Sequence, residues 1–350
     1  MKIGIPRSLF YYRFISLWEV FFTELGAVVI VSDPTNKRIL DDGVKACVDE
    51  ACLPVKLFHG HVMNLVGRVD YIFIPRFTSI SKKEYICPEF GGLPDMVRHT
   101  LKGLPELIDT EINMWTSENG AVKAAIETGA RLGAGKSASR AAFMKAMESY
   151  KDFRRRELNG DIPFTSDKRD VPLPTPLSPQ DKRTVPLSGS GIVCNQATAS
   201  PGRLRIALVG HPYNIYDRYI SMNMIGKLKK YGAEVETIEM VGAGDIEKQT
   251  TRLSKPMFWN YGRNAYGAAL HMAASGGIDG MICLSSFGCG IDSFVHDLIE
   301  RKIRREYQIP VITITIDEHS GEAGFNTRLE AFVDMLRWRR SNENNISSSG

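Results

Sequence analysis

The sequence predicts an α/β fold with two doubly wound lobes, each built on a parallel sheet, and with a helical segment and a long irregular linker between the lobes. Two observations predict this fold. Short β-branched or apolar runs alternate with helix-like stretches, and the alternation restarts late in the chain after a stretch without hydrophobic periodicity. The chain has 350 residues, 43% of them hydrophobic, which is enough apolar material for two cores.

The first lobe is expected over residues 1–103. One helix should end before Gly26, because glycine commonly lies just past a helix end. Two more helices should start at Pro54 and at Pro94, because proline suits the first turn of a helix. The expected strands of this lobe are the apolar runs 2–6, 27–32 and 69–75.

Residues 104–158 are expected to be wholly helical, apart from a glycine-rich break. The break contains the letters GAGKS. A phosphate-binding loop, however, requires glycine where Ala130 stands and a strand before it. We therefore expect any ATP to be bound by a partner. Residues 159–203 are rich in Pro, Ser, Thr and Gly and should form a flexible linker, in which Cys194 is an incidental exposed thiol.

The second lobe is expected over residues 204–340, with a last helix at about 326–339 and a disordered tail at 341–350. Its order resembles the first lobe: a strand, a tyrosine-containing loop, a helix, a Gly-Ala pair and another strand. Ligands of such sheets bind beyond the carboxyl ends of the strands, so two similar lobes predict a cleft between them. The expected strands are 204–210, 233–240, 277–285 and 311–317.

The charge and hydropathy of the chain favour a cytoplasmic protein. A net charge of +4 is small for this length and gives no reason to expect nucleic acid or an anionic membrane as the main partner. No run of eighteen apolar residues is present, and the sequence opens on a strand pattern without a signal-peptide pattern before it. Structural disulfides are rare in the cytoplasm.

Three of the six cysteines share one context. Cys52, Cys87 and Cys289 each lie in a loop that leads into an expected helix, and none of the six belongs to a CxxC pair. A helix N-terminus favours thiolate and offers N–H donors to sulfur, so three such thiolates could hold a [4Fe–4S] cluster with one iron left open. The alternative is packing, because buried cysteines are common in cores. Cys283, inside an apolar strand, and Cys47, expected within a helix, are interpreted as packing residues.

Five longer stretches resemble a known family. The stretches KIGIPRSLFYY, DEACLPVKLFHGH, PRFTSISKKEYICPEFGGLPD, LVGHPYNIYD and ITIDEHSGEAG, in this order, look like the CoA-enzyme-activase uncharacterised domain family. That family is similar to the iron–sulfur subunits of 2-hydroxyacyl-CoA dehydratases and benzoyl-CoA reductases and to double-cubane cluster proteins. The resemblance covers about residues 1–150 and 204–340. It implies two Rossmann-like lobes.

The resemblance also implies a cofactor and partners. Cys52, Cys87 and Cys289 match the cysteines that hold a [4Fe–4S] cluster in the wider family. A double cubane is less expected, since it would need Cys47 or Cys283 as well. The implied electron donor is an ATP-hydrolysing iron–sulfur activase. A homologous sister subunit or a second copy of the chain is a possible further partner. The linker at 159–203 departs from the family in its length and proline content.

Three functions remain open. The resemblance implies a component that reduces or dehydrates a small substrate or an acyl-CoA with low-potential electrons from the activase. The alternative is an electron-relay or regulatory subunit that has no substrate of its own. The third is a cluster-free protein that binds a small molecule.

Six further residues are candidates for the site. His319 and Glu322 follow an expected strand and could transfer protons, or Glu322 could simply begin the next helix. His211 and Tyr213 could line the cleft or pack in a core. The remaining two, which follow strand ends and could bind an anionic group or form surface salt bridges, are Arg7 and Arg76.

Overall fold

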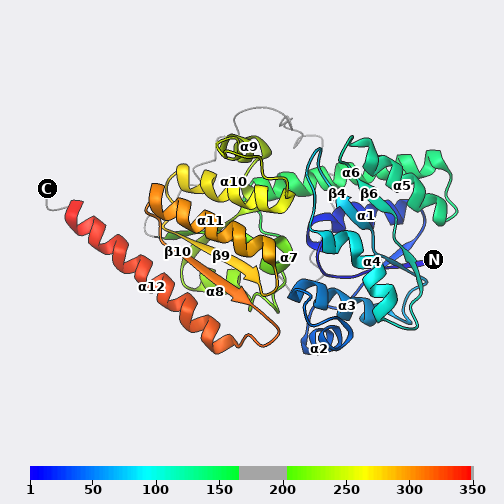
Figure 1. The fold of residues 1–350 in the computed structure, drawn as a ribbon, viewed down its shortest axis with the longest axis horizontal. Helices are drawn as coiled ribbons and strands as arrows, with labels where there is room; N and C mark the ends of the chain where they lie inside the picture. The colour runs from blue at the N-terminus through cyan, green and yellow to red at the C-terminus, as the bar shows by residue number, and fades with distance from the viewer. Residues whose placement is uncertain (165–202, 348–350) are drawn as a thin grey trace. The chain divides into compact units, whose positions relative to one another are not determined.

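The computed structural model describes residues 1–164 and 203–347, with side chains described up to residue 342, and it has the predicted α/β fold with parallel sheets (Figure 1). The described chain forms two compact units. The first unit contains Met1–Glu157 and, from later in the sequence, Met257–Tyr261, whereas the second contains nearly all the other residues from 203 onward. The predicted linker at 159–203, including Cys194, falls mostly outside the described residues.

The first unit is built on a four-stranded parallel sheet with the order β2-β1-β3-β5. A second, two-stranded parallel sheet pairs β4 with β6. The strands are β1 (Lys2–Ile5), β2 (Val28–Val31), β3 (Tyr71–Phe73), β4 (Arg76–Ser79), β5 (Glu106–Ile108) and β6 (Glu111–Asn113). The helices are α1 (Tyr11–Glu24), α2 (Lys37–Ala46), α3 (Leu53–Leu65), α4 (Pro88–Thr100), α5 (Asn119–Arg131) and α6 (Lys136–Leu158).

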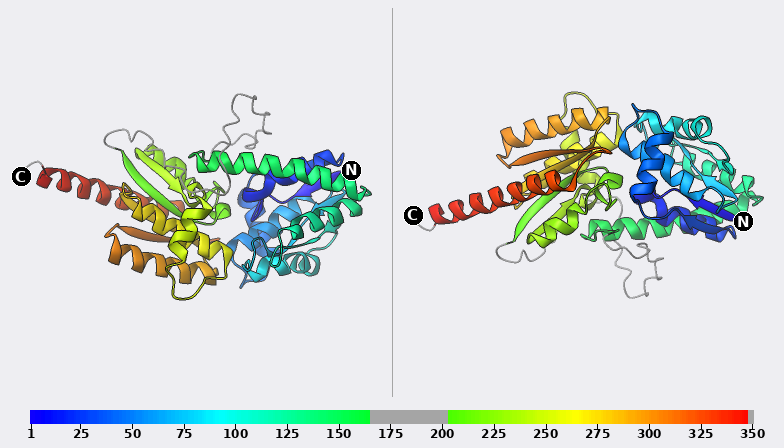
Figure 2. Two further views of the ribbon diagram at one scale, coloured as in Figure 1. Left: turned by 90° about the horizontal axis from the view of Figure 1, so that it is seen from above. Right: turned by 90° about the horizontal axis from the view of Figure 1, so that it is seen from below.

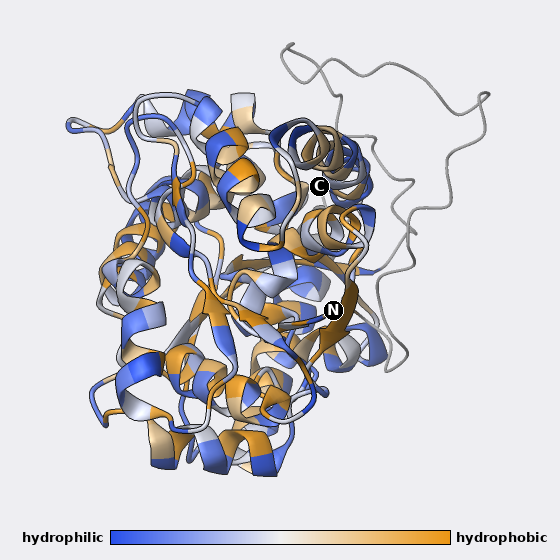
Figure 3. Ribbon diagram, turned by 90° about the vertical axis from the view of Figure 1, so that its right-hand side faces the viewer, coloured by the Kyte–Doolittle hydropathy of each residue, from blue (hydrophilic) through white to orange (hydrophobic). Residues whose placement is uncertain are grey.

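The core of the first unit follows from the apolar strands and from α1. Ile3 and Ile5 in β1 and Ile72 in β3 are fully buried, as expected for a parallel sheet covered on both faces. Figure 3 shows these strands as hydrophobic, whereas the helices alternate between hydrophobic and hydrophilic faces. Phe22 in α1 is fully buried and packs edge-on against Phe73, which fixes this helix on the sheet.

The second unit repeats the topology of the first. Its sheet has the order β10-β9-β7-β8, all parallel, so in both units the sheet's strands, numbered along the chain, lie in the order 2-1-3-4. The strands are β7 (Leu204–Gly210), β8 (Ala233–Thr237), β9 (Gly280–Ser286) and β10 (Val311–Ile316). The helices are α7 (Pro212–Ile215), α8 (Met224–Lys230), the 3₁₀ turn η2 (Ile238–Met240), α9 (Ala243–Thr250), α10 (Asn260–Ala274), α11 (Gly290–Glu306) and α12 (Glu322–Ser347).

Several predicted elements are corrected by the structure. Residues 104–158 are not wholly helical, because β5 and β6 lie in their first part. The helix predicted from Pro94 starts six residues earlier, at Pro88, and Pro94 lies inside it. The tail is helical up to Ser347, because α12 continues past the predicted end at about 339; both views in Figure 2 show its length. No helix among the described residues is long and apolar enough to cross a membrane.

Candidate functional site

The strand order identifies where a ligand site belongs in each unit. In an open parallel sheet, the crevice for a ligand lies beyond the carboxyl ends of the two strands between which the direction of winding reverses. For the order 2-1-3-4 these are the first and third strands. In the second unit they are β7, which is followed directly by His211, and β9, which is followed by the loop to Cys289.

Three side chains meet at this point of the second unit. His211 Nε2 lies 2.8 Å from Asp292 Oδ1. The possible ligand atoms of His211, Cys289 and Asp292 all lie within 4.8 Å of one another. Cys289 occupies the N-cap position of α11, and Asp292 lies in the first turn of that helix. One imidazole, one thiol and one carboxylate are therefore brought together by the loop after β7 and by the start of α11.

The surroundings of Asp292 keep it ionised. Asp292 is only 3% exposed, and this burial would raise the pKa of its carboxyl group. The charge and the hydrogen bond of His211, together with His296 and the Cys289 thiol, outweigh burial and hold the pKa of Asp292 below its ordinary value. His296 is 2% exposed, and burial lowers its pKa in spite of the nearby Asp292 carboxylate.

Several polar atoms of this group have no hydrogen-bond partner among the described residues. They are Oδ2 of Asp292, both ring nitrogens of His296 and Nδ2 of Asn214. The Oδ1 atom of Asn214 accepts a hydrogen bond of 2.8 Å from Ser286 at the end of β9. Buried polar groups are normally paired, so the unpaired atoms of Asp292 and His296, one helical turn apart on α11, indicate a site built for something other than packing.

The two residues predicted to line a cleft behave differently from each other. His211 takes part in the polar group described above. Tyr213 is buried and its ring stacks on the His211 imidazole at a centroid distance of 4.8 Å, which holds the imidazole in its orientation. Sequence reasoning missed Asp292 and His296 as site residues. Their spacing of four on a helix was the available signal, because it places both on one face.

In the first unit, Cys52 and Cys87 each occupy the N-cap position of a helix. Cys52 precedes α3 and Cys87 precedes α4, and each helix has proline in its first turn. The Cys52 thiol donates a hydrogen bond of 3.2 Å to Oε2 of Glu89, which lies in the first turn of α4. The N-termini of α3 and α4 are thus adjacent. The carbonyl of Pro54 accepts a hydrogen bond from Ser8, so the start of α3 lies beside the loop after β1.

The other described cysteines lie outside helix starts. Cys47 is not within a helix as predicted but at the C-cap of α2, and burial raises the pKa of its thiol. Glu89 raises this pKa further, whereas Lys56 lowers it. Cys283 in β9 is fully buried, which agrees with its interpretation as a packing residue, and burial strongly raises the pKa of its thiol.

Arg7 and Arg76 make different contacts. The guanidinium of Arg76 forms a two-pronged ion pair with Asp95, with N–O distances of 2.7 and 3.0 Å, and donates to the carbonyl of Gly91. These carboxylate contacts favour the salt-bridge interpretation of Arg76 over an anion site. Arg7 donates its backbone N–H to Ser32, and its guanidinium lies over the Tyr11 ring at 5.7 Å.

His319 lies in the loop between β10 and α12, and Glu322 follows that loop. Glu322 is the first residue of α12; its side chain is 68% exposed and forms an ion pair of 2.7 Å with Lys227. The hydrogen bond from Lys227 lowers the pKa of Glu322, so it is a poor proton donor at neutral pH. His319 is exposed, and its backbone N–H donates to Asp317. These contacts favour the interpretation of this loop as a helix start.

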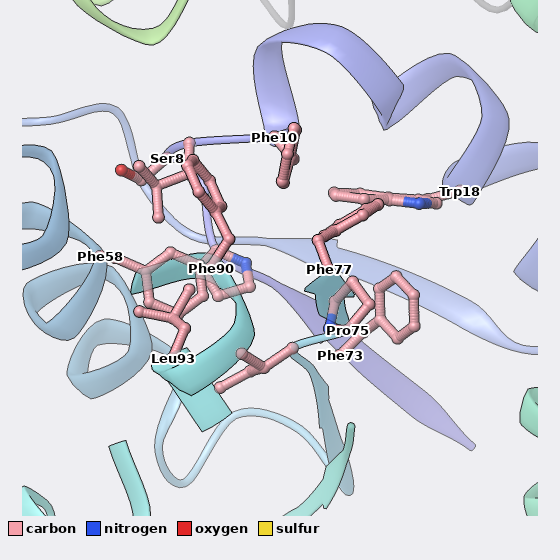
Figure 4. A pocket seen from close by; sticks show the side chains of 12 residues that line it. Ser8, Phe10, Trp18, Phe58, Phe73, Pro75, Phe77, Phe90 and Leu93 are labelled. Carbon is pink, nitrogen blue, oxygen red and sulfur yellow. The ribbon is translucent and has the colours of Figure 1, made fainter. Parts of the chain in front are cut away.

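An apolar cavity of about 20 Å³ lies at the carboxyl ends of β1 and β3, the corresponding point of the first unit (Figure 4). It is lined mainly by aromatic and aliphatic side chains, among them Phe10, Trp18 and Phe77, and Ser8 contributes the one hydroxyl group of the lining. Phe90 of α4 also lines it. The cavity has room for about one water molecule, which makes it a packing gap rather than a substrate pocket.

The donor chemistry of the chain fits an iron–sulfur cluster. Such clusters are held by cysteine thiolates. The five described cysteines are free of disulfides, and three of them stand at helix N-caps without any side-chain cap hydrogen bond. Cys283 does not fit, since it is sealed inside the sheet.

Comparison with known proteins identifies the family. No curated protein matches the chain. The family model of the 2-hydroxyglutaryl-CoA dehydratase D-component matches residues 247–336. The model described as the CoA enzyme activase uncharacterised domain matches residues 2–241, well over half of the chain. The protein therefore belongs to the CoA enzyme activase uncharacterised domain family, and its C-terminal part is similar to the D-component of 2-hydroxyglutaryl-CoA dehydratase.

Proposed function

We propose that this protein is the cluster-binding component of a system of the 2-hydroxyacyl-CoA dehydratase or benzoyl-CoA reductase type. Cys52, Cys87 and Cys289 are the proposed ligands of one [4Fe–4S] cluster. The two family matches support the class of system. The cytoplasm predicted from the sequence is a compartment in which free thiols persist.

The observation that carries the proposal is the shared position of the three cysteines. Each is the N-cap of a helix of at least thirteen residues, and none uses its side chain to cap that helix. Helix N-termini offer N–H donors and a partial positive charge, both of which stabilise thiolate sulfur. Three cysteines at helix N-caps in one chain point more specifically to cluster ligands than three cysteines buried in a core would.

The cluster, when bound, would supply low-potential one-electron chemistry at an acyl-CoA or another small substrate. The residues of this chain hold and orient it. Proline in the first turn of α3 and of α4 fixes the backbone next to Cys52 and Cys87. In the cluster-free chain, the hydrogen bond from the Cys52 thiol to Glu89 shows that the starts of α3 and α4 are adjacent.

The electron donor is proposed to be an ATP-hydrolysing iron–sulfur activase, and a sister subunit or a second copy of the chain would complete the assembly. The GAGKS stretch supports a partner as the site of ATP, because it lies between α5 and the start of α6, without a strand before it. An electron-relay subunit without a substrate of its own remains the alternative function.

Iron and acid-labile sulfide content after anaerobic reconstitution tests the ligand set. We expect about four irons per chain. We expect Cys87→Ala and Cys289→Ala to lose the cluster, and Cys47→Ala, a change of a half-buried thiol at a helix end, to keep it. Iron-free wild-type protein would overturn the proposal. Loss of iron in Cys47→Ala would overturn the three-cysteine assignment.

Electron paramagnetic resonance of the reduced protein separates the two functions. A change in the cluster signal when an acyl-CoA is added would show that a substrate is bound near the cluster. An unchanged signal with a series of acyl-CoA compounds, together with electron transfer to a partner protein, would favour the relay.

A further inference from the structure

We infer that His211, Cys289 and Asp292 form a site for a single divalent transition-metal cation in the second unit, distinct from a cluster held by three cysteines. The inference does not rest on the proposed function, although both use Cys289. It rests on geometry, burial and charge in residues of one compact unit.

The distances suit one small cation. A tetrahedral zinc-type ion with bonds of about 2.0–2.3 Å separates its ligand atoms by roughly 3.3–3.8 Å. Here the ligand atoms lie within 4.8 Å of one another, and His211 Nε2 and Asp292 Oδ1 are separated by 2.8 Å. Movements of the order of 1 Å in side chains would therefore open the group around a cation.

A divalent cation would be balanced by the charges of these three ligands. A divalent ion with one thiolate, one carboxylate and one neutral imidazole gives a neutral group, which suits a buried position. Without a cation, the Asp292 carboxylate is almost fully buried and its Oδ2 has no hydrogen-bond partner in the described parts of the chain. A buried polar atom without a partner is costly, and a metal ion bound at Oδ2 would give it one.

Surrounding residues could complete the coordination. His296 lies one helical turn after Asp292 on α11, is 2% exposed, and neither of its ring nitrogens has a partner in the described ranges. Because the two residues are four positions apart on α11, their side chains lie on the same face of the helix. Tyr213 stacks on His211 and restricts the imidazole to a small range of orientations, as expected around a metal ligand.

The ligand types select the class of metal. Imidazole and thiolate prefer zinc, cobalt and iron(II), whereas magnesium and calcium require oxygen ligands. The place of the three residues in the fold is a second argument for a ligand site, apart from their chemistry. They lie beyond the carboxyl ends of β7 and β9, where the strand order reverses.

Cobalt(II) is the probe for the test. Reduced, chelator-treated full-length chain is titrated with Co²⁺ under anaerobic conditions, and the thiolate-to-cobalt band and the tetrahedral d–d bands are recorded. We expect one Co²⁺ per chain, displaced by Zn²⁺ but not by Mg²⁺. Cys289→Ser should abolish the thiolate band, and His211→Asn and Asp292→Asn should weaken binding by at least about tenfold.

Matched variants keep the test decisive. Cys87→Ser and His271→Asn change a thiol and an imidazole outside the group and should leave the cobalt spectrum unchanged. Circular dichroism and thermal melting of the metal-free variants show that each one folds. The inference is overturned if no thiolate band forms, or if the band survives in His211→Asn but is lost in Cys87→Ser.

The same variants separate this inference from the proposed function. We expect His211→Asn to lose cobalt binding yet still to assemble iron and sulfide on reconstitution. A wild-type chain that binds cobalt but never assembles a cluster would defeat the proposed function alone. A chain that assembles a cluster but shows no cobalt–thiolate band would defeat the cation site alone.

Discussion

His61 shows how a single buried imidazole sets a pH dependence. It is fully buried in α3, with its Nδ1 2.9 Å from the Ser32 hydroxyl and its Nε2 3.0 Å from the Thr35 hydroxyl. Burial, reinforced by the charge of Arg7, lowers its pKa to about 3. The folded protein therefore holds His61 neutral at a pH where the unfolded chain would already be protonated.

We expect the free energy of unfolding to fall as the pH is lowered from 6.5 towards 3. In this window the unfolded state binds a proton at His61 that the folded state does not, so stability must decrease with acidification. The contribution between pH 6.5 and 5 is about 2 kcal/mol. Urea unfolding at both pH values measures it.

His61→Asn should have a lower free energy of unfolding at every pH. Its free energy of unfolding should also depend less on pH between 6.5 and 5, because the variant lacks the contribution of His61. His99→Asn, which changes an exposed imidazole, should retain the slope of the wild type. Parallel pH profiles for the wild type and His61→Asn would show that His61 is protonated in the folded protein.

At the scale of elements, the backbones of α2 and α3 approach each other closely at two glycines. A Cβ atom at Gly43 would overlap the carbonyl oxygen of Lys56, and one at Gly60 would overlap the carbonyl oxygen of Ile39. Backbone cannot move aside as a flexible side chain can. The position of α3, and with it the placement of Cys52 at its start, therefore depends on two glycines.

Gly43→Ala and Gly60→Ala should each destabilise the protein by about 1–3 kcal/mol or more, because the helices must move apart. Gly92→Ala is the matched control: it also lies inside a helix, but no atom outside its own helix backbone and chain neighbours lies near its added Cβ atom. This variant should be neutral or more stable by up to about 1 kcal/mol, because alanine favours helix. Thermal or urea unfolding of the three variants distinguishes the two classes.

The sequence predicts those elements that have long, uniform patterns. β7 and β9 are seven-residue apolar strands and were predicted nearly in full. β5 and β6 were missed, since three residues beginning with glutamate carry no periodicity. The start of α4 was misplaced because two prolines compete for it, and only the structure shows that Pro88 takes the first turn.

The candidate site was predictable only where a residue follows a local sequence pattern. Proline in a first helical turn is a local pattern, so Cys52 could be placed next to the start of α3 from the sequence; Cys87 was expected in a loop before a helix that starts at Pro94, and the structure shows that it is the N-cap of α4. Asp292 and His296 were missed, because polar residues four apart share a helix face but such a face normally points to solvent. Their burial arises from the packing of α11 in the second unit, which is a tertiary effect.

At the scale of the whole molecule, the two units use one topology for different purposes. At the point where the strand order reverses, the first unit has a small apolar cavity and the second has a buried polar group. The fold alone therefore does not determine the chemistry of either site.

The whole chain should not bind ATP by itself. GAGKS lies at a turn between two helices, and Lys136 is the first residue of α6. A fluorescent ATP analogue should show no saturable binding to the isolated chain, and Lys136→Ala should behave like the wild type. Saturable binding that is lost in Lys136→Ala would place nucleotide in this chain and not in the activase.

The capping pattern of the cysteines has one more consequence. Because Cys52, Cys87 and Cys289 make no side-chain cap hydrogen bond, their sulfur atoms are not acceptors for the first-turn amides of α3, α4 and α11, as serine or aspartate oxygens would be. Sulfur that carries negative charge at these positions would become such an acceptor. Occupancy should then slow hydrogen–deuterium exchange at the first-turn amides of each helix whose cysteine is a ligand. Peptide-resolved exchange would read out the ligand set in the wild-type protein, without a single mutation.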